Sequence, residues 1–233
     1  MNETLHAVLT GDIIQSRALD MIRREALADT LQKVYGCIEE QYGFAVPQGL
    51  AVFRGDSWQI YIEDPQWALQ IAVQFEATLR LVSSLEGHEI DTKIALSVDT
   101  VDFINAETPG ASDGAAFQKS GLALNNLKGK QQLVCVLPEN FPLELRLGTE
   151  HLAVVTDYLM QTWTKAQARA VSFKLSKPLE KEPRQKEIAS MWFPKPVSQP
   201  AVSRHLRAAH WSLLKATLER FREIINEIQS KAG

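Results

Sequence analysis

Up to residue 137 the chain alternates between two hydrophobic patterns. Short apolar or alternating runs, typical of strands, are found over residues 7–12, 92–98 and 132–137, and as a hairpin over 51–62. Apolar residues spaced three and four apart, typical of helices with one buried face, are found over residues 19–42, 64–82 and 112–127. The predicted order is therefore strand, helix, hairpin, helix, strand, helix, strand.

This order indicates the fold class of the first part. A hairpin pairs its strands antiparallel, and each helix has only one apolar face to bury. We therefore expect an α+β domain over residues 1–147, with helices covering a mainly antiparallel sheet.

Two Gly-Asp pairs mark the ends of predicted strands. Gly11-Asp12 ends the first strand, and Gly55-Asp56 lies at the tip of the hairpin. Magnesium is often held by one or two carboxylates together with phosphate oxygens, so two carboxylates on adjacent strand ends would suffice. The alternative is that Asp12 caps the following helix and Asp56 makes the turn.

The pattern of residues 148–233 predicts an all-α module. Thr149 and Thr164 are predicted to cap two helices, and residues 178–183 form a charged linker. Residues 185–191 and 198–206 resemble the two helices of a bacterial helix-turn-helix, placed at about 185–210. No Gly or Pro interrupts residues 201–232, which predicts one long C-terminal helix.

The second helix of this pair has an outward face suited to DNA. Ser198 and Pro200 fit its first turn, and Val202 with Leu206 anchors it. The residues left facing outward can read bases or hold phosphates: Gln199, Ser203, Arg204 and Arg207. A helix-turn-helix used only for protein contacts is the alternative, because residues 192–197 form a connection longer than usual, with two prolines.

Charge is divided unevenly along the chain. Residues 1–160 contain 11 Lys and Arg against 22 Asp and Glu, whereas residues 161–233 contain 14 against 6, which together give the net charge of -3. A basic C-terminal part favours a nucleic-acid partner. Apolar residues at 214, 218, 221, 225 and 228 form a seam that predicts either a homodimer through this helix or packing against the protein's own body.

The N-terminal motifs resemble a known family. The strand ending in Asp12-Ile13, the long helix and the Gly-Asp hairpin resemble the catalytic core of class III nucleotidyl cyclases, which implies a ferredoxin-like sheet. By that resemblance Asp12, Ile13 and Asp56 would bind Mg or Mn with a nucleotide. With the segment Asp113 to Phe117 and the helix-turn-helix added, the chain is most similar to the bacterial SatD-like proteins.

The chain departs from the cyclase pattern at three positions. Val52 occupies the place of a base-reading Lys, and Ala116 and Ser120 stand where spacing puts an Asn and an Arg that stabilise phosphates. Positive or polar side chains that could reach a bound phosphate are Ser16, Arg17, Arg54 and Lys119.

These observations lead to one functional expectation and two alternatives. We expect a DNA-binding transcriptional regulator whose cyclase-like domain senses a nucleotide with a metal, and the missing Lys, Asn and Arg favour sensing over catalysis. The alternatives are a metal-dependent nucleotidyl cyclase or phosphoryl-transfer enzyme, and a non-catalytic interaction scaffold. With no apolar run long enough for a membrane span and no signal peptide, we expect a cytoplasmic protein without a membrane partner.

Overall fold

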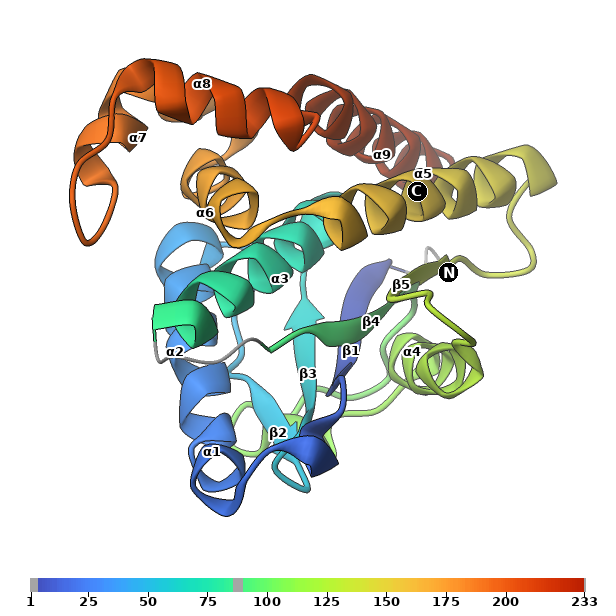
Figure 1. Cartoon of the computed structure of the whole chain (residues 1–233). Helices are drawn as coiled ribbons and strands as arrows, with labels where there is room; N and C mark the ends of the chain where they lie inside the picture. Colours follow the sequence, from blue (N-terminus) through green and yellow to red (C-terminus); the bar gives the residue numbers. More distant parts are fainter. Residues whose placement is uncertain (1–3, 86–89, 233) are drawn as a thin grey trace.

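A computed structural model describes residues 4–85 and 90–232 (Figure 1). Its N-terminal half consists of five strands and the helices that connect them. In chain order the main elements are β1 (His6–Ile13), α2 (Leu27–Tyr42), β2 (Ala51–Phe53), β3 (Ser57–Ile62), α3 (Ala68–Leu85), β4 (Thr92–Asp99), α4 (Ala115–Asn126) and β5 (Leu133–Val136). The predicted order of elements is confirmed.

The strands form one sheet in the order β2-β3-β1-β4-β5. β1 lies in the middle and pairs antiparallel with both β3 and β4, whereas β4 and β5 are parallel. α4 makes the crossover that this parallel pair requires. The expectation of a mainly antiparallel sheet covered by helices is confirmed.

The two faces of the sheet are covered by different helices. α2 and α3 pack on one face, and α4 lies on the other (Figure 1). Because side chains alternate along a strand, Leu9 and Ile13 of β1 join the main core under α3, while Val8 points toward Phe117 of α4. Asp12 is four residues from Val8 in the same strand, so its side chain lies on the same face of the sheet, toward α4.

The helix predicted to begin at Leu19 is divided in the structure. A short helix α1 (Met21–Glu25) precedes α2, which begins at Leu27. Met21 and Ile22 are 73% and 76% exposed, so the buried apolar stripe starts only at Leu27. The buried apolar stripe of α2 was predicted correctly, but the start of the helix was placed too early, at Leu19.

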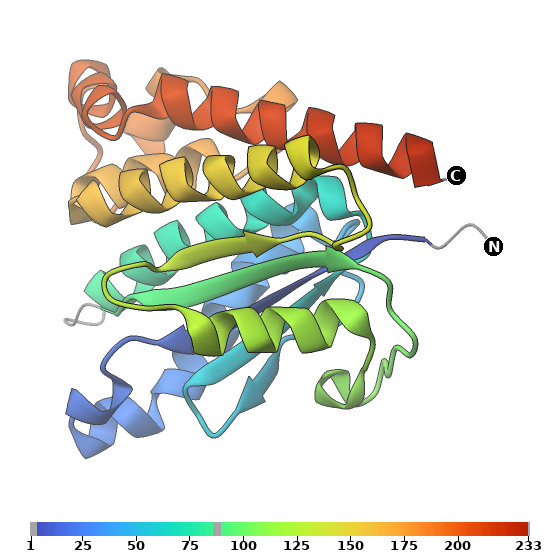
Figure 2. The same ribbon diagram turned by 90° about the vertical axis from the view of Figure 1, so that its right-hand side faces the viewer.

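The C-terminal part consists of helices that stack on α3. They are α5 (Leu143–Thr162), α6 (Lys165–Lys174), α7 (Gln185–Met191), α8 (Gln199–Ala208) and α9 (Trp211–Ala232). Figure 2 shows the layers in section: α9 over α5, α5 over α3, then the sheet, then α4. Tyr42 of α2 donates a hydrogen bond to the carbonyl of Leu175, at 2.5 Å, and so ties the two parts together.

A single hydrophobic core cluster joins residues of both predicted domains, from Leu5 to Ile228. α5 begins at Leu143, and Thr149, predicted as its cap, is fully buried inside it. The cap predicted at Thr164 is confirmed, because its side chain accepts from the backbone of Gln167 in a capping box. The division between residues 147 and 148 stays a prediction.

The apolar seam of the C-terminal helix is buried within the chain. Leu214, Leu218, Phe221, Ile225 and Ile228 are all at most 1% exposed, and α9 packs against α5. Of the two alternatives, packing against the protein's own body is therefore the one that the structure has. A dimer could not use this seam without opening the core.

The predicted uninterrupted helix over residues 201–232 is wrong. α8 ends at Ala208, His210 adopts a left-handed φ of 54°, and α9 starts at Trp211. The bend lets Ala209 and Trp211 join the core, where both are at most 9% exposed. Tertiary packing therefore overrides a continuous helical sequence pattern here.

Candidate functional site

Asp12 and Asp56 lie together at one end of the sheet. Asp12 occupies the penultimate position of β1, where its Cα is paired with Ser57 of β3 and with Lys93 of β4. Asp56 directly precedes β3, and its carbonyl accepts a hydrogen bond from the Ile13 amide at 3.1 Å. The turn before it needs a left-handed backbone, with φ of 53° at Arg54 and 87° at Gly55.

A serine holds each carboxylate in place. Ser57 donates its hydroxyl to Oδ1 of Asp12 at 2.8 Å, and Ser16 donates to Oδ2 of Asp56 at 2.7 Å. Ser16 is itself only 8% exposed, and it begins a short 3₁₀ helix that two residues separate from the end of β1. These bonds orient the acids while leaving each carboxylate an oxygen that can meet a ligand.

The acids face a cleft of about 700 Å³. The rest of its lining includes the cationic residues Arg17, Arg54 and Lys93 and residues of the last turn of α4. The lining residues are Asp12, Ile13, Gln15, Ser16, Arg17, Arg54, Asp56, Ser57, Lys93, Leu124, Asn125 and Leu127. Two acids that face three cations across a polar cleft suit a ligand that brings both a metal ion and phosphates.

The electrostatics of Asp12 favour a bound cation. Burial raises the pKa of its carboxyl above the ordinary value, and the negative charge of Asp56 raises the pKa further. The hydrogen bond from Ser57 and the charges of Lys93 and Arg17 act in the opposite direction. A divalent cation beside both acids would relieve their repulsion and restore the ionised form.

The donor set fits a metal shared with phosphate rather than a closed metal cage. Within residues 4–85 and 90–232, no group of three or more His, Cys, Asp or Glu side chains is placed to hold an ion. Two carboxylates of the cleft would leave most positions of an octahedral ion to water and ligand oxygens. Asp12 and Asp56 would hold Mg²⁺ or Mn²⁺ in this way, with Ile13 beside them.

The structure brings together most of the residues predicted to contact phosphate. Ser16, Arg17 and Arg54 line the cleft with the two acids. Lys119 does not, because it lies in α4 toward the opposite end of the sheet and forms an ion pair with Asp99 at 2.5 Å. The register of β1 and β4 pairs Asp99 with His6 and Lys93 with Asp12, which places these two lysines at opposite ends.

Several residues of the cleft were missed from the sequence, among them Ser57, Lys93 and Asn125. Lys93 could have been found as the one basic residue in an otherwise mostly apolar strand, but its pairing with Asp12 depends on strand register. Asn125 lies in the last turn of α4, whereas spacing had pointed to Ala116 and Ser120. Those two are fully buried under the helix, and Ser120 bonds Thr10 of β1 at 2.7 Å.

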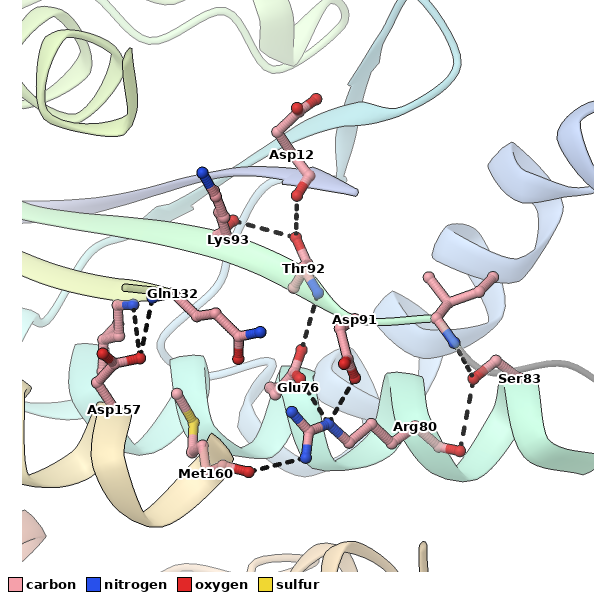
Figure 3. A network of polar contacts seen from close by, with 12 residues as sticks. Asp12, Glu76, Arg80, Ser83, Asp91, Thr92, Lys93, Gln132, Asp157 and Met160 are labelled. Carbon is pink, nitrogen blue, oxygen red and sulfur yellow. Dashed lines mark hydrogen bonds and ion pairs between the residues drawn. The ribbon is translucent and has the colours of Figure 1, made fainter. Parts of the chain in front are cut away.

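A polar network continues from Asp12 through the sheet to the helices behind it (Figure 3). The Thr92 hydroxyl donates to the Asp12 carbonyl at 3.0 Å, and the Thr92 amide donates to the buried Glu76 at 3.3 Å. Glu76 pairs with Arg80 at 2.7 Å, and Arg80 also reaches Asp91 at 2.7 Å and the Met160 carbonyl at 2.8 Å. The backbone of Asp12 is thus connected to α3 and α5.

The residues predicted to contact DNA lie in one helix. Gln199, Arg204 and Arg207 of α8 are exposed, and Ser203 is half-buried. Ser198 caps α8, and Val202 and Leu206 anchor it with at most 2% exposure, as predicted. The connection from α7 to α8 is long and contains a cis Phe193-Pro194 bond. A helix-turn-helix module is not confirmed by this arrangement.

Within the part of the chain that the structure describes, no helix combines the length and apolarity needed to cross a bilayer.

Comparison with known proteins finds likeness in structure only. No family model matches the chain, and no curated protein matches it at a significant level. A crystal structure of the guanylyl cyclase Cya2 is 17% identical over 56% of this chain and 74% of that chain, with a TM-score of 0.43. Adenylate cyclases from Trypanosoma brucei in their monomeric state are 14% identical over 58% and 74%, with a TM-score of 0.41.

A third structure is of the same kind. The adenylyl cyclase CyaB from P. aeruginosa is 12% identical over 56% of this chain and 76% of that chain, with a TM-score of 0.40. The structural neighbours named here are thus nucleotidyl cyclases that match about half of the chain. Membership of the SatD-like proteins stays a prediction. At these identities the chemistry of the cleft has to be inferred from its own residues.

Proposed function

We propose that the cleft binds a nucleoside triphosphate together with a divalent cation, and that the chemistry it serves is phosphoryl transfer. The observation that supports this most directly is the pairing of Asp12 and Asp56 in one cleft with Arg17, Arg54 and Lys93. Carboxylates attract the metal ion, and the surrounding cations attract the phosphates that the ion bridges.

Each side chain has a distinct role in this proposal. Asp12 and Asp56, oriented by Ser57 and Ser16, would hold the cation that neutralises and orients the phosphates. Lys93 and the arginines would contact phosphate oxygens, with Arg able to do so in a bidentate manner. The amide of Asn125 can donate a hydrogen bond to a phosphate or accept one from a base or sugar.

The test is incubation with each of the four ribonucleoside triphosphates and Mn²⁺, followed by chromatography and mass spectrometry. We expect a new phosphorylated product from the wild type and none from Asp12→Asn. Asp102→Asn makes the same charge change at an exposed residue outside the cleft and should keep activity.

Binding is measured alongside, so that sensing and catalysis can be told apart. Manganese and triphosphate binding without a product, lost in Asp12→Asn, would retain the binding site and reject the enzyme. Absence of both product and binding in the wild type would reject the whole proposal.

A second candidate function is supported by α8. Its exposed Gln199, Arg204 and Arg207 lie in a helix that contains no acidic residue. As a DNA-binding element it would contact phosphates and base edges. We then expect Arg204→Ala to weaken duplex DNA binding and to reduce the slope of log affinity against log salt by about 1.

Arg220→Ala is the matched control for this test, because Arg220 is exposed on α9 and paired with Glu223 at 2.8 Å. Equal binding by both variants and the wild type, or no salt dependence, would reject α8 as a DNA contact.

A further inference from the structure

A second cavity lies at the same end of the sheet, on the side of α3. It has a volume of about 390 Å³ and is enclosed by α3, the starts of β4 and β5, and the junction of α5 with α6. Its lining residues are Ile14, Arg80, Ile90, Asp91, Lys93, Gly129, Lys130, Gln132, Gln161, Trp163 and Lys165. The proposed nucleotide function makes no use of this cavity.

The lining of this cavity has an excess of positive charge. Its lining includes the cationic residues Arg80, Lys130 and Lys165, against Asp91 as the one acidic residue, while the amine of Lys93 points toward Asp12 (Figure 3). The Arg80 guanidinium is largely satisfied by Glu76, Asp91 and the Met160 carbonyl, so Lys130 supplies much of the remaining attraction for an anion. A bound carboxylate or phosphate would reduce this excess.

The remaining wall is suited to an organic group. Ile14, Ile90 and Trp163 give the cavity apolar surface. Gln132 points into the space between β5 and α3 (Figure 3), and its buried Oε1 has no hydrogen-bond partner. A buried amide oxygen without a partner is costly, and a ligand with an N–H or O–H group would satisfy it.

From these features we propose that this cavity is a second ligand site, for a small organic anion that has an apolar body and one hydrogen-bond donor. Its occupant would contact both the sheet and the α5–α6 junction. It would also lie against the network that leads to Asp12, because the backbone carbonyl of Asp91 accepts a hydrogen bond from the Ile14 amide at 2.9 Å and Lys93 lines both cavities. The cavity is therefore adjacent to the metal cleft but separate from it.

The test uses anilinonaphthalene sulfonate, an aromatic anion whose fluorescence rises in apolar sites, with the full-length protein. We expect one saturable site per chain and an affinity about tenfold weaker in Lys130→Glu, since hydrogen bonds to charged groups contribute this order of free energy. Lys128→Glu makes the same charge change in the same loop, outside the cavity, and should bind like the wild type.

A second measurement locates the probe. Saturating probe should slow acetylation of the Lys130 amine, followed by mass spectrometry, while Lys128 is acetylated at an unchanged rate. Absence of saturable binding, equal loss in both variants, or no protection of Lys130 would overturn the proposal. The experiment contains no metal or nucleotide, so its outcome is independent of the function proposed for the Asp12 cleft.

Discussion

Gly11, the residue before Asp12, is required by close packing rather than by backbone conformation. A Cβ added there would lie 2.2 Å from the ring of Trp58. Trp58 is fully buried and stacks on Phe75 with ring centroids 4.0 Å apart, so it has no room to move away. We predict that Gly11→Ala lowers the free energy of unfolding by about 1–3 kcal/mol, measured by urea denaturation.

Gly36→Ala is the matched control for this prediction. Gly36 lies in α2, and a Cβ added there would meet nothing within 4 Å. Replacing a helical glycine at an open position should stabilise the protein by about 0.5–1 kcal/mol. If both substitutions change stability equally, the packing explanation for Gly11 is wrong.

At the same scale, the two central acids of the cleft were predictable from the sequence, but their neighbours were not. Asp12 and Asp56 each belong to a Gly-Asp pair that comes shortly after an apolar run, so local pattern is enough to place each near a strand end. Lys93 and Asn125 reach the cleft through strand register and through the length of α4, which are non-local properties. Lys119 was predicted to reach the cleft but does not, because its charge alone gave no indication of which end of the sheet it occupies.

At the scale of elements, α9 shows why a heptad-like seam is ambiguous in a sequence. The same four-three spacing suits a partner helix in another chain and a partner helix in the same chain. In the structure α9 packs against α5 of the same chain. It also contacts the N-terminal part, where the Arg222 guanidinium lies 4.2 Å from the centre of the Trp67 ring. Only knowledge of the whole fold resolves the choice.

This packing predicts a large stability effect at the centre of the seam. Phe221 is fully buried, so Phe221→Ala should lower the free energy of unfolding by about 3–5 kcal/mol. Leu213→Ala, at a residue of the same helix that is 51% exposed, should change it by less than about 0.5 kcal/mol. A loss of dimer with unchanged monomer stability, seen by light scattering and urea denaturation, would contradict the intramolecular assignment.

At the scale of the whole molecule, the sequence predicted the α+β layer well and the assembly of the layers poorly. Strand and helix order depend on local periodicity, which is strong here. The stacking of α5 and α6 on α3 depends on matching surfaces far apart in sequence, such as the hydrogen bond of 3.1 Å between Thr78 and Ser172. A change of charge at residue 160 indicated two parts but could not show that they share one core.

The pair of Glu76 and Arg80 is where these layers meet, and it predicts a pH dependence. Complete burial raises the pKa of Glu76 to about 7, assisted by Asp91 and opposed by the charge of Arg80, from an ordinary value of 4.5. Between these two values the folded protein holds a proton that the unfolded chain releases. The contribution of Glu76 to stability is therefore full below pH 4.5 and is lost as the pH rises to about 7.

Glu76→Gln tests this, because an amide oxygen can still accept the bond from the Thr92 amide but cannot ionise. As the pH rises across that window, the unfolding free energy of the wild type should fall relative to that of Glu76→Gln by about 1.4 kcal/mol per pH unit. Other acids with raised pKa values, such as Asp12 and Asp157, are common to both proteins and cancel in the difference. Parallel pH profiles from urea denaturation would mean that Glu76 is already ionised throughout the window, with Arg80 outweighing its burial.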